Sequence, residues 1–240
     1  ALSRPPPSRH LTHTGLSRSL GYSLCRYHVI PVSTRFDAPY SRLDNGLAET
    51  RHVFLDGNHL PARFAPGFHI AELGFGTGLN LLTVWKTWDE SGQTTPLSFT
   101  TFEAFPMSPE EMEKALAAIP ELSDYATRLV AAYAEDPTLA TLAGIHARVV
   151  IGDARETLAA QSFEADAWFL DGFSPAKNPE LWDADLMAQV GAHTKAGGTA
   201  ATYTAAGFVR RNLEAAGFTV TRAPGFGRKR HMTHCEKPAT

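Results

Sequence analysis

The sequence predicts an α/β protein with a Rossmann-like, mostly parallel sheet of seven strands and an antiparallel hairpin at its edge. The first observation is that short apolar or β-branched runs alternate with helix-like segments from Phe68 onward. Such alternation produces right-handed crossovers between parallel strands, with helices on both faces of the sheet. The second observation is that the last segment, 218–234, has a Gly-rich turn between two strand-like runs and no room for a crossover helix. It therefore predicts the hairpin.

The individual elements follow from these runs in chain order. The expected strands are 69–73, 97–103, 146–151, 165–170, 198–204 and 218–222, followed by the returning strand. Their largely apolar composition is typical of strands that are covered on both faces. The expected helices are 79–88, 109–118, 121–134, 154–160, 183–191 and 207–216. The second helix has a clear start signal, with Ser108 as N-cap, Pro109 at N1 and Glu111 at N3.

The N-terminal part of the chain is expected to differ from this core. Residues 1–30 contain no Asp or Glu and show no sustained periodicity, so we expect a disordered or non-family extension. An organellar transit peptide is the alternative. Residues 31–240 then form one domain, with an N-terminal cap or hairpin at 31–66 and a Rossmann-like core at 67–235. Within the cap, 51–64 is expected to be a small hairpin or a strand with a turn at Asp56-Gly57.

Composition sets limits on function. A hydrophobic fraction of 43% and a charged fraction of 20% are ordinary for a soluble globular protein of 240 residues. The two cysteines, Cys25 and Cys235, cannot form a disulfide framework, which favours a reducing, cytoplasmic location. The net charge of −3 argues against non-specific nucleic-acid binding but leaves room for a local basic patch.

The glycine loop AELGFGTGLN (71–80) follows the first core strand and opens a helix. Cofactors of open α/β sheets bind at this place, outside the carboxyl ends of the strands. A dinucleotide fingerprint fails in both registers, because Leu79 and Leu81 stand where the third glycine is required. The form from Glu72 to Gly78 is acid-x-G-x-G-x-G, which resembles the first motif of Rossmann-like S-adenosylmethionine-dependent methyltransferases. The alternative is a tight strand–helix turn without a ligand.

Three further acids end successive strands. Glu103 closes the second strand, where this class places an acceptor for the ribose hydroxyls, and Asp153 follows the third, where it places an acid near the adenine amino group. Asp171 follows the fourth, beside the reacting end of the cofactor. Glu103 or Asp153 alone could be an exposed loop carboxylate, and Asp171 could be a helix N-cap. Together with Glu72, Glu103 and Asp153 place three acids at the ends of three successive strands, which favours a cofactor site.

Longer strings resemble one family, the methyltransferase domain of the bacterial tRNA 5-methylaminomethyl-2-thiouridine biosynthesis protein. The resemblance extends from Pro31 to about Met232. The strings that carry it are PVSTRFDAPYSRLDNGLAETRHVFLDGNHLPARF (31–64), AELGFGTGLN (71–80), FEAFP (102–106), AWFLDGFSPAKNPELW (167–182), TAAGFVRRNLEAAGF and GFGRKRHM. The resemblance identifies 31–240 as a methyltransferase domain. It implies transfer of a methyl group from S-adenosylmethionine to the primary amine of 5-aminomethyl-2-thiouridine at the tRNA wobble position.

The resemblance also implies site residues. Asp171 is the expected catalytic residue, holding the amine in line with the methyl group, with proton acceptance as a second role. The expected cofactor-binding residues are Glu72, Gly74, Phe75, Gly76, Thr77, Gly78, Asn80, Glu103, Asp153, Ala154, Asp171 and Gly172. The expected substrate-binding residues are Phe173, Lys177, Arg228, Lys229 and Arg230. Phe173 and also Trp182 could stack on a flipped base, with packing as the alternative, and the cations could contact phosphates, with a solvated charge run as the alternative.

Expectations for other partners follow as well. No metal is expected, because His231, His234 and Cys235 lack a fourth ligand and lie near the chain end, where a frayed tail is the simpler interpretation. The sequence shows no second glycine-rich nucleotide motif, so the chain resembles the single-domain members without the flavin oxidase domain. A separate enzyme would then supply the aminomethyl uridine on the tRNA anticodon stem-loop. The rival functions are methylation of a small-molecule amine and non-catalytic tRNA binding.

Overall fold

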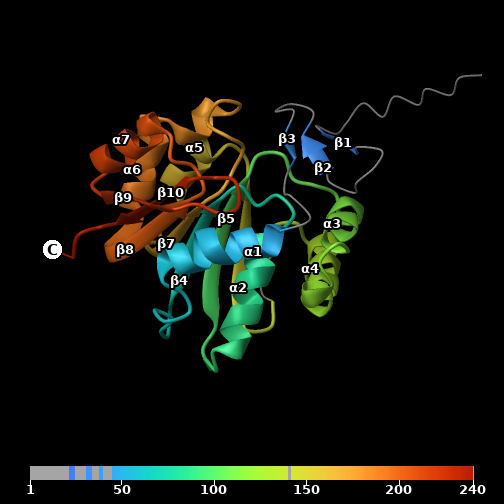
Figure 1. Ribbon diagram of the computed structural model, residues 1–240. Helices are drawn as coiled ribbons and strands as arrows, with labels where there is room; N and C mark the ends of the chain where they lie inside the picture. The colour runs from blue at the N-terminus through green and yellow to red at the C-terminus, as the bar shows by residue number, and fades with distance from the viewer. Residues whose placement is uncertain (1–21, 25–30, 34–37, 40–44, 140–141, 240) are drawn as a thin grey trace, which may run out of the picture.

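The computed structural model describes residues 22–24, 31–33, 38–39, 45–139 and 142–239. Its centre is a seven-stranded sheet in the order β6-β5-β4-β7-β8-β10-β9 (Figure 1). The strands are β4 (His69–Leu73), β5 (Leu97–Glu103), β6 (Ile145–Ile151), β7 (Ala165–Leu170), β8 (Thr194–Thr202), β9 (Thr219–Pro224) and β10 (His231–Glu236). Strands β4 to β8 pair in parallel, and β10 is antiparallel to both β8 and β9. The predicted mostly parallel sheet with an antiparallel edge hairpin is confirmed.

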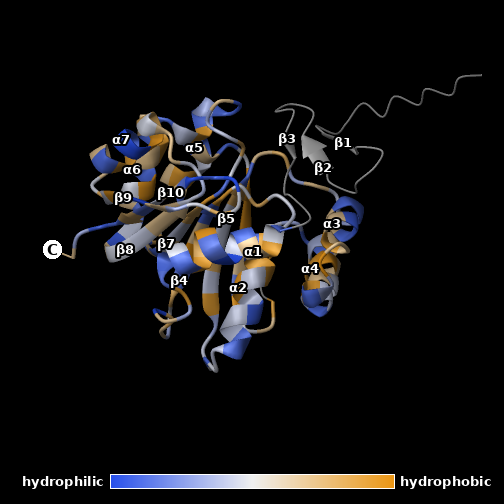
Figure 2. Ribbon diagram, viewed as in Figure 1, coloured by the Kyte–Doolittle hydropathy of each residue, from blue (hydrophilic) through white to orange (hydrophobic). Residues whose placement is uncertain are grey.

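Helices cover both faces of this sheet (Figure 1). They are α2 (Leu79–Glu90), α3 (Pro109–Leu116), α4 (Ser123–Glu135), α5 (Ala154–Thr157), α6 (Ala184–Ala192) and α7 (Gly207–Ala215). Side chains alternate along a strand, so Phe169 joins a core under α2 and α4 while Trp168 and Leu170 join a second core under α5, α6 and α7. Apolar stretches accordingly run through the central strands (Figure 2).

The predicted start of α3 is confirmed. The backbone N–H of Ser108 donates to Glu111 Oε2 at 3.0 Å, which is the reciprocal half of a capping box. Pro109 occupies the first helical position, where its missing N–H costs nothing.

The prediction of a hairpin or strand over 51–64 is wrong. The chain there continues α1 (Gly46–Thr50) through a turn of π-helix, η1 (Arg51–Leu55), into a 3₁₀ turn, η2 (Asp56–Asn58). Three successive apolar side chains, at 53–55, are buried against the core, and in the sequence such a run is indistinguishable from a buried strand. Gly57 is a close-packing residue, because a Cβ there would lie 2.9 Å from the Ala201 side chain.

Two expectations for the chain ends also need correction. Tyr22–Leu24, within the segment expected to be an extension, forms β1, which pairs with β2 (Pro31–Ser33), and β2 pairs with β3 (Ala38–Pro39). The rest of 1–30, including Cys25, lies outside the described residues. The segment 231–236 is an inner strand with Cys235 buried, not a frayed tail, because its alternate side chains fill the core. Within the parts of the chain that the structure describes, every helix is too short or too polar to cross a membrane.

Candidate active site

A cavity of about 980 Å³ lies at the carboxyl ends of the central strands. Its volume is at the upper end of the roughly 300–1,000 Å³ that is usual for small-molecule sites. Most of the predicted site residues line it: Gly74, Phe75, Gly76, Thr77, Asn80, Glu103, Asp153, Ala154, Asp171, Gly172, Phe173, Lys177 and Lys229. Four predicted residues, Glu72, Gly78, Arg228 and Arg230, lie outside its lining. The parallel topology therefore gathers the predicted strand-end residues around one space.

The glycine loop packs directly against the segment that carries Asp171. Gly74 has a φ of +88°, and its N–H donates to Phe102 O at 2.9 Å. A Cβ at Gly74 would lie 2.6 Å from the backbone oxygen of Asp171. Gly78 has a φ of +77°, and a Cβ there would press on Leu129. Glycine is therefore required at both positions, because the φ angle is positive and a Cβ atom would clash with neighbouring atoms.

Glu103 is buried at the end of β5, where it fixes the glycine loop. Its Oε2 accepts from the N–H of Gly76 at 2.9 Å, and its Oε1 accepts from the N–H of Phe105 at 2.8 Å. Burial raises the pKa of this carboxyl, and the backbone N–H groups oppose the shift. The carboxyl group also lines the cavity, so a ligand there can contact it.

Asp153 lines the cavity but also serves its own helix. As the N-cap of α5 it accepts from the Arg155 N–H at 3.0 Å, and the Arg155 guanidinium lies 2.5 Å from its Oδ2. This pairing was not foreseen from the sequence, and it occupies acceptor sites of the predicted adenine-binding carboxylate.

Asp171 is held by a chain of polar side chains that leads into the protein. Asn80 Nδ2 donates to Asp171 Oδ2 at 2.9 Å and to Glu72 Oε1 at 2.8 Å, and the N–H of Gly172 donates to Asp171 Oδ1 at 2.8 Å. Thr101 donates to Glu72 Oε2 at 2.6 Å, behind the cavity wall. Glu72 is completely buried, so it supports Asp171 through Asn80 and does not face the cavity.

Burial raises the pKa of the Asp171 and Glu72 carboxyl groups. Burial raises the pKa of Asp171 to about 6, and the nearby Glu49 adds to this shift, while the bonds from Asn80 and Gly172 and the charge of Lys229 oppose it. Burial raises the pKa of Glu72 well above its usual 4.5, more than the bonds from Thr101 and Asn80 lower it. Asp171 is therefore ionised at neutral pH but remains close to titration.

Glu49 and Tyr203 are among the cavity residues that the sequence analysis did not name. Lys229 Nζ lies 2.6 Å from Glu49 Oε1 and 3.9 Å from the centre of the Tyr203 ring. Tyr203 in turn donates its hydroxyl to Gly172 O at 2.8 Å. Tyr203 follows β8 directly, as Asp171 follows β7, and this position was an available signal. Glu49 offered none, because its segment was not predicted to be helical.

The predicted substrate-binding residues separate into two groups. Phe173, Lys177 and Lys229 line the cavity. Arg228 and Arg230 lie outside its lining, and both are exposed. Trp182 is fully buried, and its Nε1 donates to Phe173 O at 3.0 Å, so it packs in the core and is not available for a base.

Comparisons with known proteins agree with this geometry. A family model described as S-adenosyl-L-methionine-dependent methyltransferase matches residues 120–238. The tRNA 5-methylaminomethyl-2-thiouridine biosynthesis bifunctional protein MnmC of Hahella chejuensis is 42% identical over 219 residues, which are 85% of this chain and 34% of that protein. The chain thus spans about a third of the length of this curated relative.

The fold has a solved counterpart. The crystal structure of MNMC2 from Aquifex aeolicus aligns with a TM-score of 0.71 at 23% identity and covers 93% of this chain and 72% of that one. The family match, the curated relative and the strand-end cavity lead to one conclusion: the chain belongs to the S-adenosyl-L-methionine-dependent methyltransferases.

Proposed function

We propose that the protein N-methylates the 5-aminomethyl group of (2-thio)uridine at the tRNA wobble position and so forms 5-methylaminomethyl-2-thiouridine. The observation that carries the proposal is that Asp171 and residues 74–77 of the glycine loop bound the same cavity. A carboxylate is thereby available beside the place where a methyl donor binds in this fold. The name of the Hahella relative supports this choice of substrate.

The cavity suits S-adenosylmethionine on chemical grounds. Glu103 lines the cavity and would accept from ribose hydroxyls, and the backbone around Gly76 leaves the loop open to close approach. Asp153, Ala154 and Gly152 would face the adenine end. When bound, the cofactor supplies a methyl group on a positively charged sulfur. The protein's part is to exclude water, hold the amine and keep it in line, and such alignment can contribute up to ~7–11 kcal/mol.

Asp171 would act mainly by orienting the amine. An alkylammonium has a pKa near ~10 and is mostly protonated at neutral pH. The pKa of Asp171 is about 6, so its ionised carboxylate is a weak base for that proton but a strong hydrogen-bond acceptor. We therefore assign it first to binding the nitrogen and second to accepting the proton. Glu49, paired with Lys229, would close the same end of the cavity.

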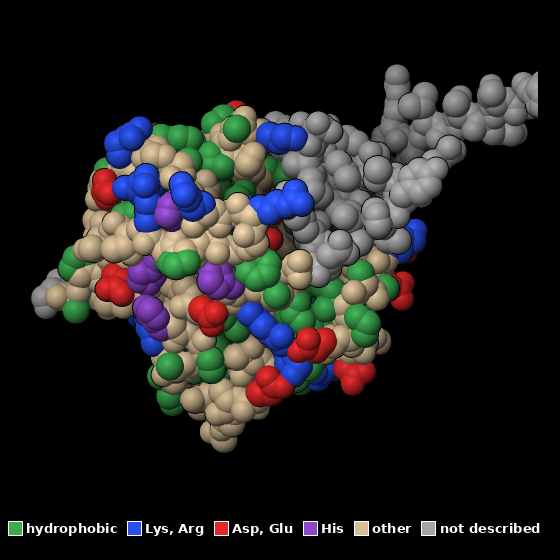
Figure 3. Space-filling model, in the orientation of Figure 1, with side chains coloured by type: hydrophobic (Ala, Val, Ile, Leu, Met, Phe, Trp, Pro, Cys, Tyr) green, Lys and Arg blue, Asp and Glu red, His purple; other side chains and the backbone are tan. Residues whose placement is uncertain are grey.

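The RNA would reach the site as a flipped nucleotide from a single-stranded loop. Phe173 borders the cavity and could stack on the base, and Lys177 lies on the same rim. Lys and Arg side chains gather over α7 and β9 on one face (Figure 3). The exposed Arg228 and Arg230 follow β9 and would contact phosphates.

The chain divides into a cap and a catalytic core, and both contribute to the cavity. We infer that 67–235 is the catalytic core and that 31–66 is a cap, because Glu49 and Thr50 from the latter line the cavity. The reaction needs tRNA that already carries the primary amine, so another enzyme activity must supply it. We place the reaction in the cytoplasm.

The test is mass spectrometry of wobble nucleosides after incubation of the protein with S-adenosylmethionine and tRNA that carries 5-aminomethyl-2-thiouridine. We expect a gain of one methyl group with the wild-type protein and none with Asp171→Asn. Methylation of small amines with no tRNA-dependent product would support the small-molecule alternative. Binding of tRNA without any binding of S-adenosylmethionine in calorimetry would support a non-catalytic module.

A further inference from the structure

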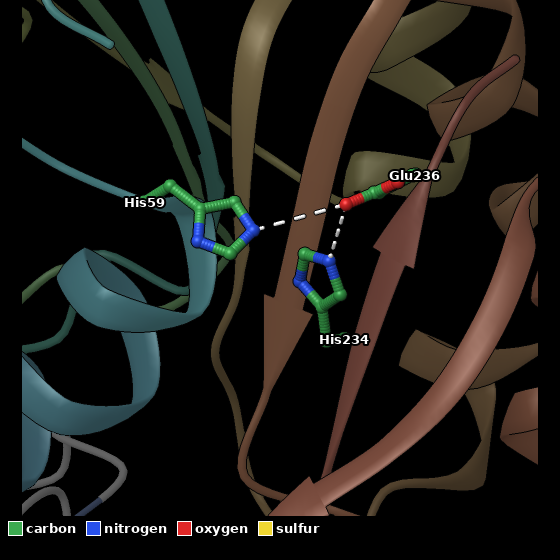
Figure 4. A group of neighbouring side chains, drawn as sticks. All are labelled: His59, His234 and Glu236. Atoms are coloured by element: carbon green, nitrogen blue, oxygen red, sulfur yellow. Dashed lines mark hydrogen bonds and ion pairs between the residues drawn. The ribbon is translucent and has the colours of Figure 1, made fainter. Parts of the chain in front are cut away.

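Two histidines and a glutamate converge on a surface outside the cavity: His59, His234 and Glu236 (Figure 4). His234 Nε2 lies 3.1 Å and His59 Nε2 lies 3.8 Å from the same oxygen, Glu236 Oε1. All three ligand atoms lie within 4.8 Å of one another. None of them lines the cavity of the proposed methyl transfer. Nitrogen and carboxylate ligands in this combination suit zinc and related divalent ions.

The fold brings these residues together from distant parts of the chain. His234 and Glu236 are two residues apart on β10 and therefore project from the same face of the sheet. His59 directly follows η2 with a φ of 56°, in the left-handed region that, among residues other than glycine, Asn, Asp and His adopt most often. Its ring lies edge-on to that of His234, with centroids 5.1 Å apart.

The hydrogen bond at the other ring nitrogen of His234 determines what its Nε2 can do. Nδ1 lies 2.6 Å from Gly57 O, and a carbonyl can only accept, so Nδ1 carries the proton. In a neutral ring Nε2 then presents a lone pair, yet it faces the Glu236 carboxylate at 3.1 Å. Two lone pairs at this distance repel unless a proton or a metal ion lies between them. A backbone carbonyl on Nδ1 is also the usual support of a metal-ligating histidine.

The spacing is close to that of a zinc site. Zinc ligands at about 2.0–2.2 Å in tetrahedral geometry lie roughly 3.3–3.6 Å apart, and the two nitrogen–oxygen separations, 3.1 and 3.8 Å, bracket this range. The side chains of His59 and Glu236 are each 57% exposed and so have room for a small adjustment. A hollow of about 370 Å³ beside both residues can admit water as the fourth ligand.

Two cations border the same hollow, and they limit the affinity. Arg63 donates to Thr199 Oγ1 at 2.6 Å and to Asn58 O at 3.1 Å, and Lys237 Nζ donates to Thr194 O at 2.6 Å. The N–H groups of Arg63 and Lys237 donate to these oxygens, but the positive charges of the two side chains oppose the binding of a metal cation nearby. With three protein ligands, of which one is a carboxylate, binding should be weaker than that of four-ligand structural zinc sites.

We propose that His59, His234 and Glu236 form a divalent transition-metal site that takes Zn²⁺ and ties β10 to the segment after η2. The site is separate from methyl transfer and does not rest on the proposed function. Zinc bound there would be stabilising, because the ion binds the folded chain and the two segments lie far apart in the unfolded chain.

The test uses tag-free, metal-stripped protein titrated with ZnCl₂ in calorimetry, together with thermal unfolding at each zinc concentration. We expect one saturable site per chain in the micromolar range and a rise of several degrees in Tm. The variants His59→Ala and Glu236→Gln should each weaken binding at least ~10-fold. His231→Ala removes an exposed histidine of the same strand that is not in the cluster, and it should bind zinc as the wild type does.

A second measurement distinguishes the metal site from a simple ion pair. Proton–nitrogen correlation spectra of the His234 ring should show Nδ1–H retained and Nε2 shifted without a proton when zinc is added. Nε2–H that persists at saturating zinc would assign the group to an imidazolium–carboxylate pair and overturn the proposal. The proposal also fails if no binding saturates below about 100-fold molar excess of zinc, or if both variants bind as tightly as the wild type.

Discussion

Asn80 Nδ2 donates to Asp171 Oδ2 at 2.9 Å and so joins the first turn of α2 to the residue that follows β7. The amide cannot turn freely, because its oxygen accepts from the Thr50 hydroxyl at 2.9 Å. The same Nδ2 donates to the buried Glu72. Thr50 and Glu72 therefore hold the Asn80 amide in place, and the amide in turn orients Asp171.

We expect Asn80→Ala to lower the rate of methyl transfer by roughly 10–100-fold, because displacement of a positioned group by about 1 Å has a cost of that order. Unfolding free energy should fall by about 1–3 kcal/mol, since Glu72 loses a buried donor. Single-turnover rates and urea denaturation would measure the two effects. Thr50→Val removes only the bond to the amide oxygen and should have a smaller effect on rate. A full rate in Asn80→Ala would contradict the positioning role.

The acid limb of the rate–pH profile should report Asp171. The substrate amine must lose a proton before it attacks, so the logarithm of the rate is expected to rise with pH at a slope of about 1. Below the Asp171 pKa of about 6, protonation of this carboxyl should raise the slope to about 2. The measurement is kcat/KM for tRNA between about pH 5 and pH 8 at saturating S-adenosylmethionine. A straight line through this pKa would exclude a role for ionised Asp171.

Asp171→Asn should stabilise the fold while it abolishes transfer. The folded pKa of about 6 is above the ordinary 3.8, so the folded state binds this proton more tightly than the unfolded chain does. The associated stability is complete below pH ~4 and is lost as pH rises to about 6, a difference of roughly 3 kcal/mol. Asparagine avoids this loss but gives up one accepted hydrogen bond, so we expect a net gain of ~1–2 kcal/mol at about pH 8.

Urea denaturation at about pH 4 and about pH 8 measures this effect. The gain in unfolding free energy from Asp171→Asn should be present at the higher pH and absent at the lower one, where the wild-type carboxyl is already protonated in the folded protein. An equal effect at both pH values would show that ionisation of Asp171 is not its source.

Gly74→Ala and Gly67→Ala form a matched pair. Both glycines have positive φ, +88° and +76°, but a Cβ at Gly67 meets nothing within 4 Å, whereas one at Gly74 meets the Asp171 backbone. We expect Gly67→Ala to cost about 1 kcal/mol of unfolding free energy and Gly74→Ala ~2–4 kcal/mol. Calorimetry should also find weaker S-adenosylmethionine binding only in Gly74→Ala. Equal destabilisation of both variants would mean that the loop can move away from Asp171.

The core of the fold was predictable because its signals are local. Each core strand is an apolar run, and the Ser108 cap and the Gly-rich turn are recognisable within a few residues. Residues 51–58 were not predictable in this way, since a buried run such as Val53–Leu55 fits a strand as well as a helical turn. Asp171, Glu103 and Asp153 could be found by their places at strand ends. Glu49 and the proximity of His59 to Glu236 depend on tertiary packing, which no local pattern records.

The basic triplet 228–230 should divide into two functions. Arg228 and Arg230 are exposed, so their replacement by alanine should weaken tRNA binding and reduce the slope of log K against log salt by ~0.7–0.9 for each phosphate that is no longer neutralised. Lys229 lies against Glu49 and Tyr203 in the cavity wall, so Lys229→Ala should leave that slope nearly unchanged and lower kcat. Filter binding of tRNA at several salt concentrations and steady-state kinetics would measure these effects. The division fails if Lys229→Ala reduces the salt slope as much as Arg228→Ala does, because Lys229 would then bind RNA phosphate and not support the cavity wall.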